Sequence, residues 1–449
     1  MRNLLFILTF FVWTNFVQSQ NTYYMATDGN DANPGTIGSP KKTIESAIDL
    51  LSAGDILYIR GGTYRSEKVV GTVNRFVVQS KNGSVGDSIY ILNYPGETVI
   101  FNCDEQLIPG TSGDGPVALK FINCSYLKVK GIRVTGLNQN PANINTPLGL
   151  GLSNVDNSLF ELIEVDNIQG YGWYFQDGSS NNYVKNCDVH HIGDVYSGWT
   201  GANGFNITGG DGSTDNTFDG SRAWWCSDDG FDLFGTNTRT TFINCWAFLN
   251  GYQPGTLTTA GDGQGFKLGP ATNDQSATVL RWLYGCIAAK NRVNGFDQNS
   301  QSNTTCRYIF YNNTAIDNGS NGYFFGANTG TVQTFKNNLN YNNGIWGDEI
   351  QSGANIDDNS WNGGVTVTSG DFQSTDYTQL YGTRQADGSL PLITYARPAE
   401  GSDLIDFCTT DFGYGNDVGA LQYGVTTPPV IPSGVKYYMR GKVYKIIAQ

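Results

Sequence analysis

Short apolar runs alternate with polar turns through most of the chain. Segments such as 241–247 and 309–315 alternate apolar and polar side chains and then reach Asn, Gly or Asp, which are typical turn residues. Most runs lead to a glycine followed by an aromatic residue, and these glycines stand at positions 172, 204, 230, 265, 295 and 322. They lie 26 to 35 residues apart. Short strands with this period and asparagines at the turns predict an all-β chain folded as a parallel β-helix.

One helix is predicted ahead of this repeat. Ser39-Pro40 would begin it, because proline is favoured at the first helical position, and Gly54 would end it. Apolar residues at 44, 47, 48 and 51 recur at helical spacing between them. The open end of a solenoid needs cover, so we expect this short helix to cap the β-helix within an N-terminal region of about residues 20–66.

Both ends of the chain differ from the repeat. Residues 1–19 contain the basic Arg2, then an apolar run, and then a cleavage site with a small residue, which is the pattern of a secretory signal peptide. We therefore expect a protein that is secreted, periplasmic or on the cell surface. No other apolar run reaches about 18 residues, so no membrane span is predicted. Residues 20–425 would form the β-helix domain, and residues 426–449 a linker and a short tail, which could be a strand pair.

Charge and cysteine content narrow the possible partners. The net charge of −13 makes the chain a poor nucleic-acid binder. It would also repel acidic substrates unless a bound cation reverses the local electrostatic potential. Eight cysteines in a secreted chain could form disulfides, but three of them (Cys187, Cys245 and Cys286) recur at equivalent positions of the repeat. Stacked cysteines of this kind behave as small buried apolar residues, so we expect free thiols. We also expect the protein to be a monomer.

The strand register predicts a cluster of functional side chains. The aromatic residue after each glycine is expected to point inward, so its neighbours point outward. Neighbouring coils are about 4.8 Å apart. Asn203, Asp229 and Asp232 should therefore converge, with Lys267 one coil further on and Asp228 at the turn beside them.

Crowded carboxylates repel one another unless a cation neutralises them. Oxygen ligands favour Ca²⁺, and only two histidines are present, which excludes a histidine-rich metal site. A cation would also lower the pKa of Lys267 and allow it to act as a general base. The chemistry that fits is removal of the C5 proton of a uronic acid, followed by β-elimination. The alternative interpretation of Asp228, Asp229 and Asp232 is a turn with solvated acids, and that of Lys267 is an ordinary surface lysine.

Other side chains are candidates for substrate binding. Lys290 and Arg292 follow the Lys267 coil and could hold substrate carboxylates. Asp297 flanks Lys267 and could orient it. Trp225 and Tyr252 could stack on sugar rings, although aromatic residues in such loops pack against the protein about as often. The loops 192–202 and 250–263 would form the walls of the cleft.

The chain resembles polysaccharide lyase family 9 in its motifs. The matching stretches are Arg222 to Phe234, Asn244 to Gly251 and Gly265 to Gly269. This resemblance implies a right-handed β-helix and calcium-dependent cleavage of acidic pectic chains from plant cell walls. It also implies an aspartate cluster at Asp228, Asp229 and Asp232 and a base at Lys267. The family pattern has a further aspartate where this chain has Asn203, whose amide oxygen could still bind calcium.

Three questions stay open at this level. The substrate could be polygalacturonate or the rhamnogalacturonan backbone. The chain could instead be an inverting glycoside hydrolase that uses Asp229 and Asp232, since such enzymes need two carboxylates about 6.5–9.5 Å apart. It could also be a glycan-binding β-helix without catalytic activity, because a fold alone does not determine function.

Overall fold

The computed structural model describes residues 20–66, 74–104, 114–141, 146–207, 212–234, 239–269, 280–299, 306–326, 332–344, 347–425, 436–439 and 442–445. The predicted signal peptide and the predicted linker lie outside these residues. Within the described ranges, no helix is both long and apolar enough to cross a membrane.

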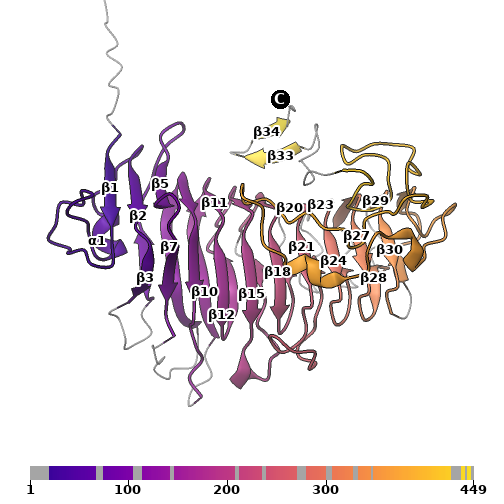
Figure 1. The fold of residues 1–449 in the computed structure, drawn as a ribbon, viewed down its shortest axis with the longest axis horizontal. Coiled ribbons are helices and arrows are strands. Elements are labelled where there is room, and N and C mark those ends of the chain that lie inside the picture. The colour runs from indigo at the N-terminus through magenta and orange to yellow at the C-terminus, as the bar shows by residue number, and fades with distance from the viewer. Residues whose placement is uncertain are drawn as a thin grey trace, which may run out of the picture.

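The described strands before residue 358 form three parallel sheets that wind as a β-helix (Figure 1). Sheet I contains β1 (Thr22–Met25), β2 (Ile56–Ile59), β5 (Ile89–Asn93), β8 (Leu127–Lys130), β11 (Leu159–Glu161), β14 (Tyr183–Lys185), β17 (Asn216–Asp219), β20 (Arg239–Ile243), β23 (Leu280–Tyr284), β26 (Arg307–Tyr311), β29 (Thr334–Lys336) and β32 (Asn355–Asp357). Sheet II contains β3 (Gly62–Arg65), β6 (Val99–Asn102), β9 (Ile132–Thr135), β12 (Glu164–Ile168), β15 (Asp188–Ile192), β18 (Arg222–Cys226), β21 (Trp246–Phe248), β24 (Ile287–Ala289), β27 (Thr314–Ile316) and β30 (Leu339–Tyr341). Sheet III contains β4 (Phe76–Gln79), β7 (Asp114–Ser125), β10 (Thr146–Asp156), β13 (Tyr171–Gln176), β16 (Phe205–Ile207), β19 (Phe231–Asp232), β22 (Phe266–Lys267), β25 (Phe296–Asp297), β28 (Asn321–Phe325) and β31 (Gly347–Ile350).

Stacked aromatic rings fill the interior next to sheet III. Phe205, Phe231, Phe266 and Phe296 follow one another with ring centroids 4.8 to 4.9 Å apart, and all four are buried. Each is the residue that follows a glycine of the repeat, so the predicted inward direction is confirmed. Because this residue points inward, the next residue on each strand must point outward.

Asparagine side chains stack at the turns, as predicted. The amide nitrogen of Asn250 donates to Asn291 Oδ1 at 2.9 Å, and Asn291 and Asn318 repeat the bond with the following coils. These bonds satisfy buried polar groups that would otherwise destabilise a tight turn. All eight cysteines are buried and free, which confirms the predicted thiols.

The predicted helix is shorter than expected at both ends, since it also stops well before Gly54. Helix α1 spans Ile44–Ile48, and its N-cap is Thr43, whose side chain accepts a hydrogen bond from Ser46 N. Pro40 is therefore not the first helical residue, because Lys41 beside it pairs with Met25 in an extended conformation. The helix lies at the N-terminal end of the stack (Figure 1) and contributes Ile44, Ala47 and Ile48 to the core. Its role as a cap stays a prediction.

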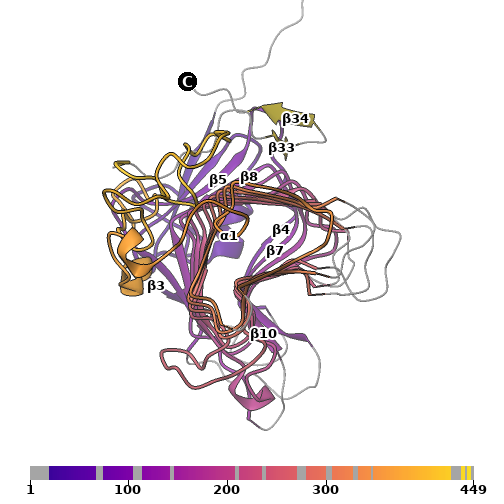
Figure 2. The ribbon, with the colours of Figure 1, turned by 90° about the vertical axis from the view of Figure 1, so that its right-hand side faces the viewer.

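Residues 358–425 form an irregular layer outside sheet II that the repeat did not predict. Figure 2 looks along the stack and shows this orange-to-yellow segment beside the superposed coils. It contains η2 (Ser369–Asp371) and η3 (Tyr377–Tyr381), and Leu380, Ile393 and Tyr395 pack against the apolar outer side chains of sheet II. Beyond it, β33 (Lys436–Met439) and β34 (Lys442–Lys445) form an antiparallel pair, which confirms the strand-pair alternative for the tail.

Candidate active site

The outward side chains of sheet III form the predicted column. Asn206 is in register with Asp232, Asp232 with Lys267, and Lys267 with Asp297. The long loops that lead from β15 to β16 and from β21 to β22 connect sheet II to sheet III next to this column. The predicted adjacency of Lys267 and Asp232, one coil apart, is thus confirmed.

Lys267 makes two ion pairs on the outside of the β-helix. Its Nζ lies 2.9 Å from Asp229 Oδ2 and 3.2 Å from Asp262 Oδ2. The side chain is only 10% exposed, whereas that of Asp262 is 65% exposed. The amine is therefore held between a buried carboxylate and one that faces solvent.

Three carboxylates lie close together around this amine. Asp228, Asp229 and Asp262 each offer an oxygen atom, and these oxygens lie within 4.8 Å of one another. Backbone groups hold two of these carboxylates, because Asp229 Oδ1 accepts from Gln264 N at 2.7 Å and Asp228 Oδ1 accepts from Asp262 N. Asp262 was missing from the predicted set. Its signal was an acid between two glycines in the long loop, three residues before the glycine of the next glycine–aromatic pair.

Asn203 braces the cluster through both ends of its amide. Its Oδ1 accepts from the backbone nitrogen of Asp229 at 2.9 Å, and its Nδ2 donates to Asp232 Oδ2 at 2.7 Å. Asp232 Oδ1 is also bonded, to Phe234 N at 2.7 Å. In this arrangement Asn203 presents its amide nitrogen to the acids, and its oxygen is occupied by the backbone. An amide oxygen has two lone pairs, so the role of Asn203 as a metal ligand stays a prediction.

Burial and mutual repulsion perturb the titration of these groups. Burial, with the neighbouring charge of Asp229, raises the pKa of Asp228 to about 9. Burial likewise raises the pKa of Asp232 to about 7 and that of Asp229 above its ordinary value. Burial alone would lower the pKa of Lys267, but Asp229, Asp232 and Asp228 together raise it. One ammonium group therefore does not balance the surrounding acids.

These residues fit a hard divalent cation. The donors near one another are carboxylate oxygens, which are the ligands that Ca²⁺ takes in proteins. The raised pKa values of Asp228 and Asp232 show that further positive charge would stabilise the ionised acids.

Two of the other candidate residues have protein partners, and their role in holding substrate carboxylates stays a prediction. The Arg292 guanidinium donates to the carbonyl oxygens of Gly261 and Asp262, so it braces the loop. Lys290 pairs with Asp317 at 3.4 Å and lies over the ring of Tyr377. Neither partner of Lys290 belongs to the Lys267 cluster, and residue 377 lies in the outer layer.

The remaining candidates also have protein partners. The carboxylate of Asp297 accepts from Asn294 at 2.6 Å and from Asn299 N, and it makes no ion pair with Lys267 among the described contacts. Trp225 and Tyr252 lie edge to face, with ring centroids 6.5 Å apart. Their role in stacking on sugars stays a prediction.

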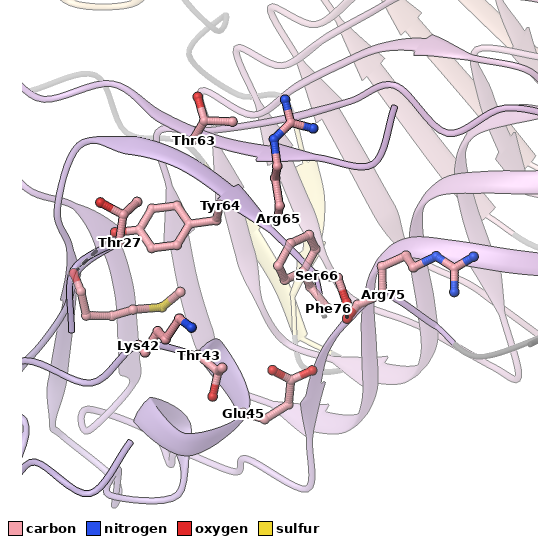
Figure 3. A pocket seen from close by; sticks show the side chains of 11 residues that line it. Thr27, Lys42, Thr43, Glu45, Thr63, Tyr64, Arg65, Ser66, Arg75 and Phe76 are labelled. Carbon is pink, nitrogen blue, oxygen red and sulfur yellow. Dashed lines mark hydrogen bonds between the residues drawn. The ribbon is translucent and has the colours of Figure 1, made fainter. Parts of the chain in front are cut away.

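A separate cavity of about 380 Å³ lies at the N-terminal end of the molecule, between α1, β3 and β4 (Figure 3). Thr43, Glu45, Tyr64 and Phe76 are among the side chains that line it. Strand β22, which carries Lys267, is six strands further along sheet III than β4. The cavity is therefore not part of the carboxylate cluster.

Comparison with known proteins shows the family to which the chain belongs. Residues 23–349 match the family model described as the Pel9A-like, right-handed β-helix region. The chain belongs to this family. The pectate lyase PEL9 of Emericella nidulans is 30% identical over 87% of this chain and 94% of its own length. Pectate lyase L of Dickeya dadantii is 29% identical over 91% of this chain and 92% of its own.

Solved structures agree with the family assignment. The crystal structure of pectate lyase Pel9A superposes with a TM-score of 0.74 and 27% identity, covering 91% of this chain and 97% of that one. A rhamnogalacturonan lyase superposes with a TM-score of 0.72 and 27% identity, covering 85% and 97%. The predicted right-handed β-helix and the resemblance to polysaccharide lyase family 9 are confirmed, and the chain is a polysaccharide lyase.

Proposed function

We propose that this polysaccharide lyase cleaves galacturonate-containing pectic chains by calcium-dependent β-elimination, with Lys267 as the general base. The observation that carries the proposal is the position of Lys267 Nζ, 2.9 Å from Asp229 and beside a cluster of carboxylates that needs positive charge. The relatives of similar length are named pectate lyases, which supports an acidic pectic substrate.

Asp228, Asp229, Asp232 and Asp262 are the residues that would hold Ca²⁺, and Asn203 would keep Asp232 and the Asp229 backbone in place. When bound, the ion would neutralise these acids and the substrate carboxylate and stabilise the charge that develops next to it. The residues that raise the pKa of Lys267 are the same acids. Neutralising them removes the cause of the raised pKa, so Lys267 can then give up its proton.

Deprotonated Lys267 would take the proton from C5 of a uronate residue. The electron pair of the C5–H bond forms the C4–C5 double bond, and the C4–O4 bond breaks. The leaving oxygen takes a proton from solvent, so atoms and charge balance. Lys267 is suited to this step because its ion pairs hold the amine on the outer face of sheet III, beside the acids that would bind the ion.

Polygalacturonate is the first candidate substrate because the curated relatives named above are pectate lyases. Rhamnogalacturonan is the second, since the rhamnogalacturonan lyase covers the chain almost as well as Pel9A does. We further propose that the lyase domain spans residues 20–425, that residues 1–19 direct secretion, and that the protein acts as a monomer.

Absorbance of the unsaturated uronate product tests the proposal. Polygalacturonate and rhamnogalacturonan are each incubated with the protein, once with calcium and once with a chelator. We expect absorbing product from one of the two substrates with calcium, and none with the chelator. Cleavage that survives the chelator and yields no absorbing product would instead indicate a hydrolase. Binding without any cleavage would favour a non-catalytic role.

A further inference from the structure

The loop that carries Asp262 is packed tightly against the acid cluster. The backbone nitrogen of Gly261 donates to Ser227 O at 2.7 Å, so the loop lies directly on the turn that precedes Asp228. A Cβ atom at Gly261 would collide with Asp228 Oδ1, and one at Gly263 would come within 2.8 Å of Arg292 Cβ. Both positions therefore require glycine for this approach.

Arg292 fastens this loop from the next coil. Its Nε donates to Gly261 O at 2.9 Å and its Nη2 to Asp262 O at 3.0 Å, while its own backbone nitrogen donates to Asn250 O. A guanidinium is planar and holds two acceptors in a fixed geometry, which an ammonium group cannot do. Arg292 thus holds the backbone on either side of the Asp262 side chain.

Asp262 is the exposed member of the cluster. Its carboxylate lies 3.2 Å from Lys267 Nζ and shares the 4.8 Å neighbourhood with Asp228 and Asp229. Asn203, by contrast, carries no charge and has its amide oxygen bonded to the Asp229 backbone. The negative charge that position 203 lacks is available from Asp262.

We propose that Arg292 is a positioning residue that holds Asp262 in place as a ligand of the calcium ion. The proposal rests on the calcium-dependent function proposed above. Asp262 would hold the ion together with Asp228 and Asp229, and the ion would supply the positive charge that these acids need.

Calcium titration calorimetry on the full chain tests this role without relying on activity. We expect Asp262→Asn and Arg292→Lys each to weaken calcium binding about tenfold or more, since residues that orient metal ligands have effects of this size. Because Arg292 acts through Asp262, the double variant should bind no more weakly than Asp262→Asn alone. The matched control is Asp357→Asn, which removes a half-exposed acid paired with Lys336 at 3.4 Å at the far end of the stack.

The outcomes are separable. Wild-type affinity in both single variants would overturn the role of Asp262 and leave the proposed function standing. Additive losses in the double variant would show that Arg292 acts independently of Asp262, which also overturns the proposal. Failure of the wild-type protein to bind calcium would refute the calcium-dependent function itself. Melting temperatures without calcium verify that the variants are folded.

Discussion

Two charge clusters lie on neighbouring sheets of this β-helix, and their net charges have opposite signs. On sheet II, Asp188 is bound by two guanidinium groups, with Arg222 Nη2 at 2.8 Å and Arg384 Nη2 at 2.6 Å. Beside sheet III, the ammonium group of Lys267 lies among Asp228, Asp229, Asp232 and Asp262, and it is the single cation of this cluster within the described residues. The first cluster has excess positive charge, and the second has excess negative charge.

This difference in net charge is the one expected between a structural cluster and the functional cluster proposed above. Burial would raise the pKa of Asp188, but Arg384 and Arg222 hold it well below its ordinary value. Arg222 also donates to Leu380 O and Gly382 O, so the cluster ties the outer layer to the coils. The sheet III acids have raised pKa values because protein groups alone do not neutralise them, which is typical of a site that awaits a ligand.

Replacing the amine gives the largest expected effect. Lys267→Ala should lower the rate of unsaturated product formation by about 10³-fold or more, because the general base is lost. Polysaccharide binding, measured by affinity electrophoresis, should persist. Near-normal activity in this variant would show that another group removes the proton.

Breaking the Asp188 cluster should act on stability instead. Asp188→Asn leaves two buried guanidinium groups without their carboxylate, and we expect the free energy of unfolding to fall by about 3–5 kcal/mol. Denaturant unfolding measures this loss. At temperatures where the variant is folded, kcat should stay close to that of the wild type. A large fall in kcat there would contradict the division between the two clusters.

The two clusters should also respond to pH with opposite signs. The folded pKa values of Asp228 and Asp232, about 9 and 7, lie above those of the unfolded chain. The folded state therefore binds more protons between about pH 4 and these values, so calcium-free stability should fall as pH rises, by up to about 1.4 kcal/mol per pH unit for each group. The contribution of Asp188, whose pKa is lowered, is instead lost as pH falls below about 4.

Thermal unfolding between pH 5 and 9, with and without calcium, measures this slope. Calcium should flatten it, because the ion stabilises the ionised carboxylates. Asp228→Asn should flatten it in the absence of calcium. A calcium-free stability that rises with pH over this range would contradict the proposed imbalance.

The smallest effect is expected at the edge of the column. Asp297 is adjacent to Lys267 in register, but its carboxylate is bonded to Asn294 and Asn299 N. Asp297→Asn should therefore change kcat/KM by less than about tenfold, or 1.4 kcal/mol. A loss as large as that of Lys267→Ala would show that Asp297 orients the base after all.

Much of the site could be predicted because a β-helix converts sequence period into spatial position. Once Phe231 and Phe266 are assigned to the interior, Asp232 and Lys267 must be outward neighbours on adjacent coils. Asp262 could not be found in this way, because it lies in a loop outside the repeat. Loop conformation depends on contacts such as those of Arg292 with Gly261, which have no periodic signature.

The sequence by itself determined the β-helical coil, the inward aromatic stack and the order of the outward acids and of Lys267 along sheet III. Alternation and period are local properties of the chain, so they can be recognised without the tertiary structure. The tertiary structure alone decided which charges meet across loops and layers. It placed Asp262 beside Lys267, turned the Asn203 amide, and brought Arg384 to Asp188 across 196 residues. Such contacts depend on packing between distant segments, and no local pattern specifies them.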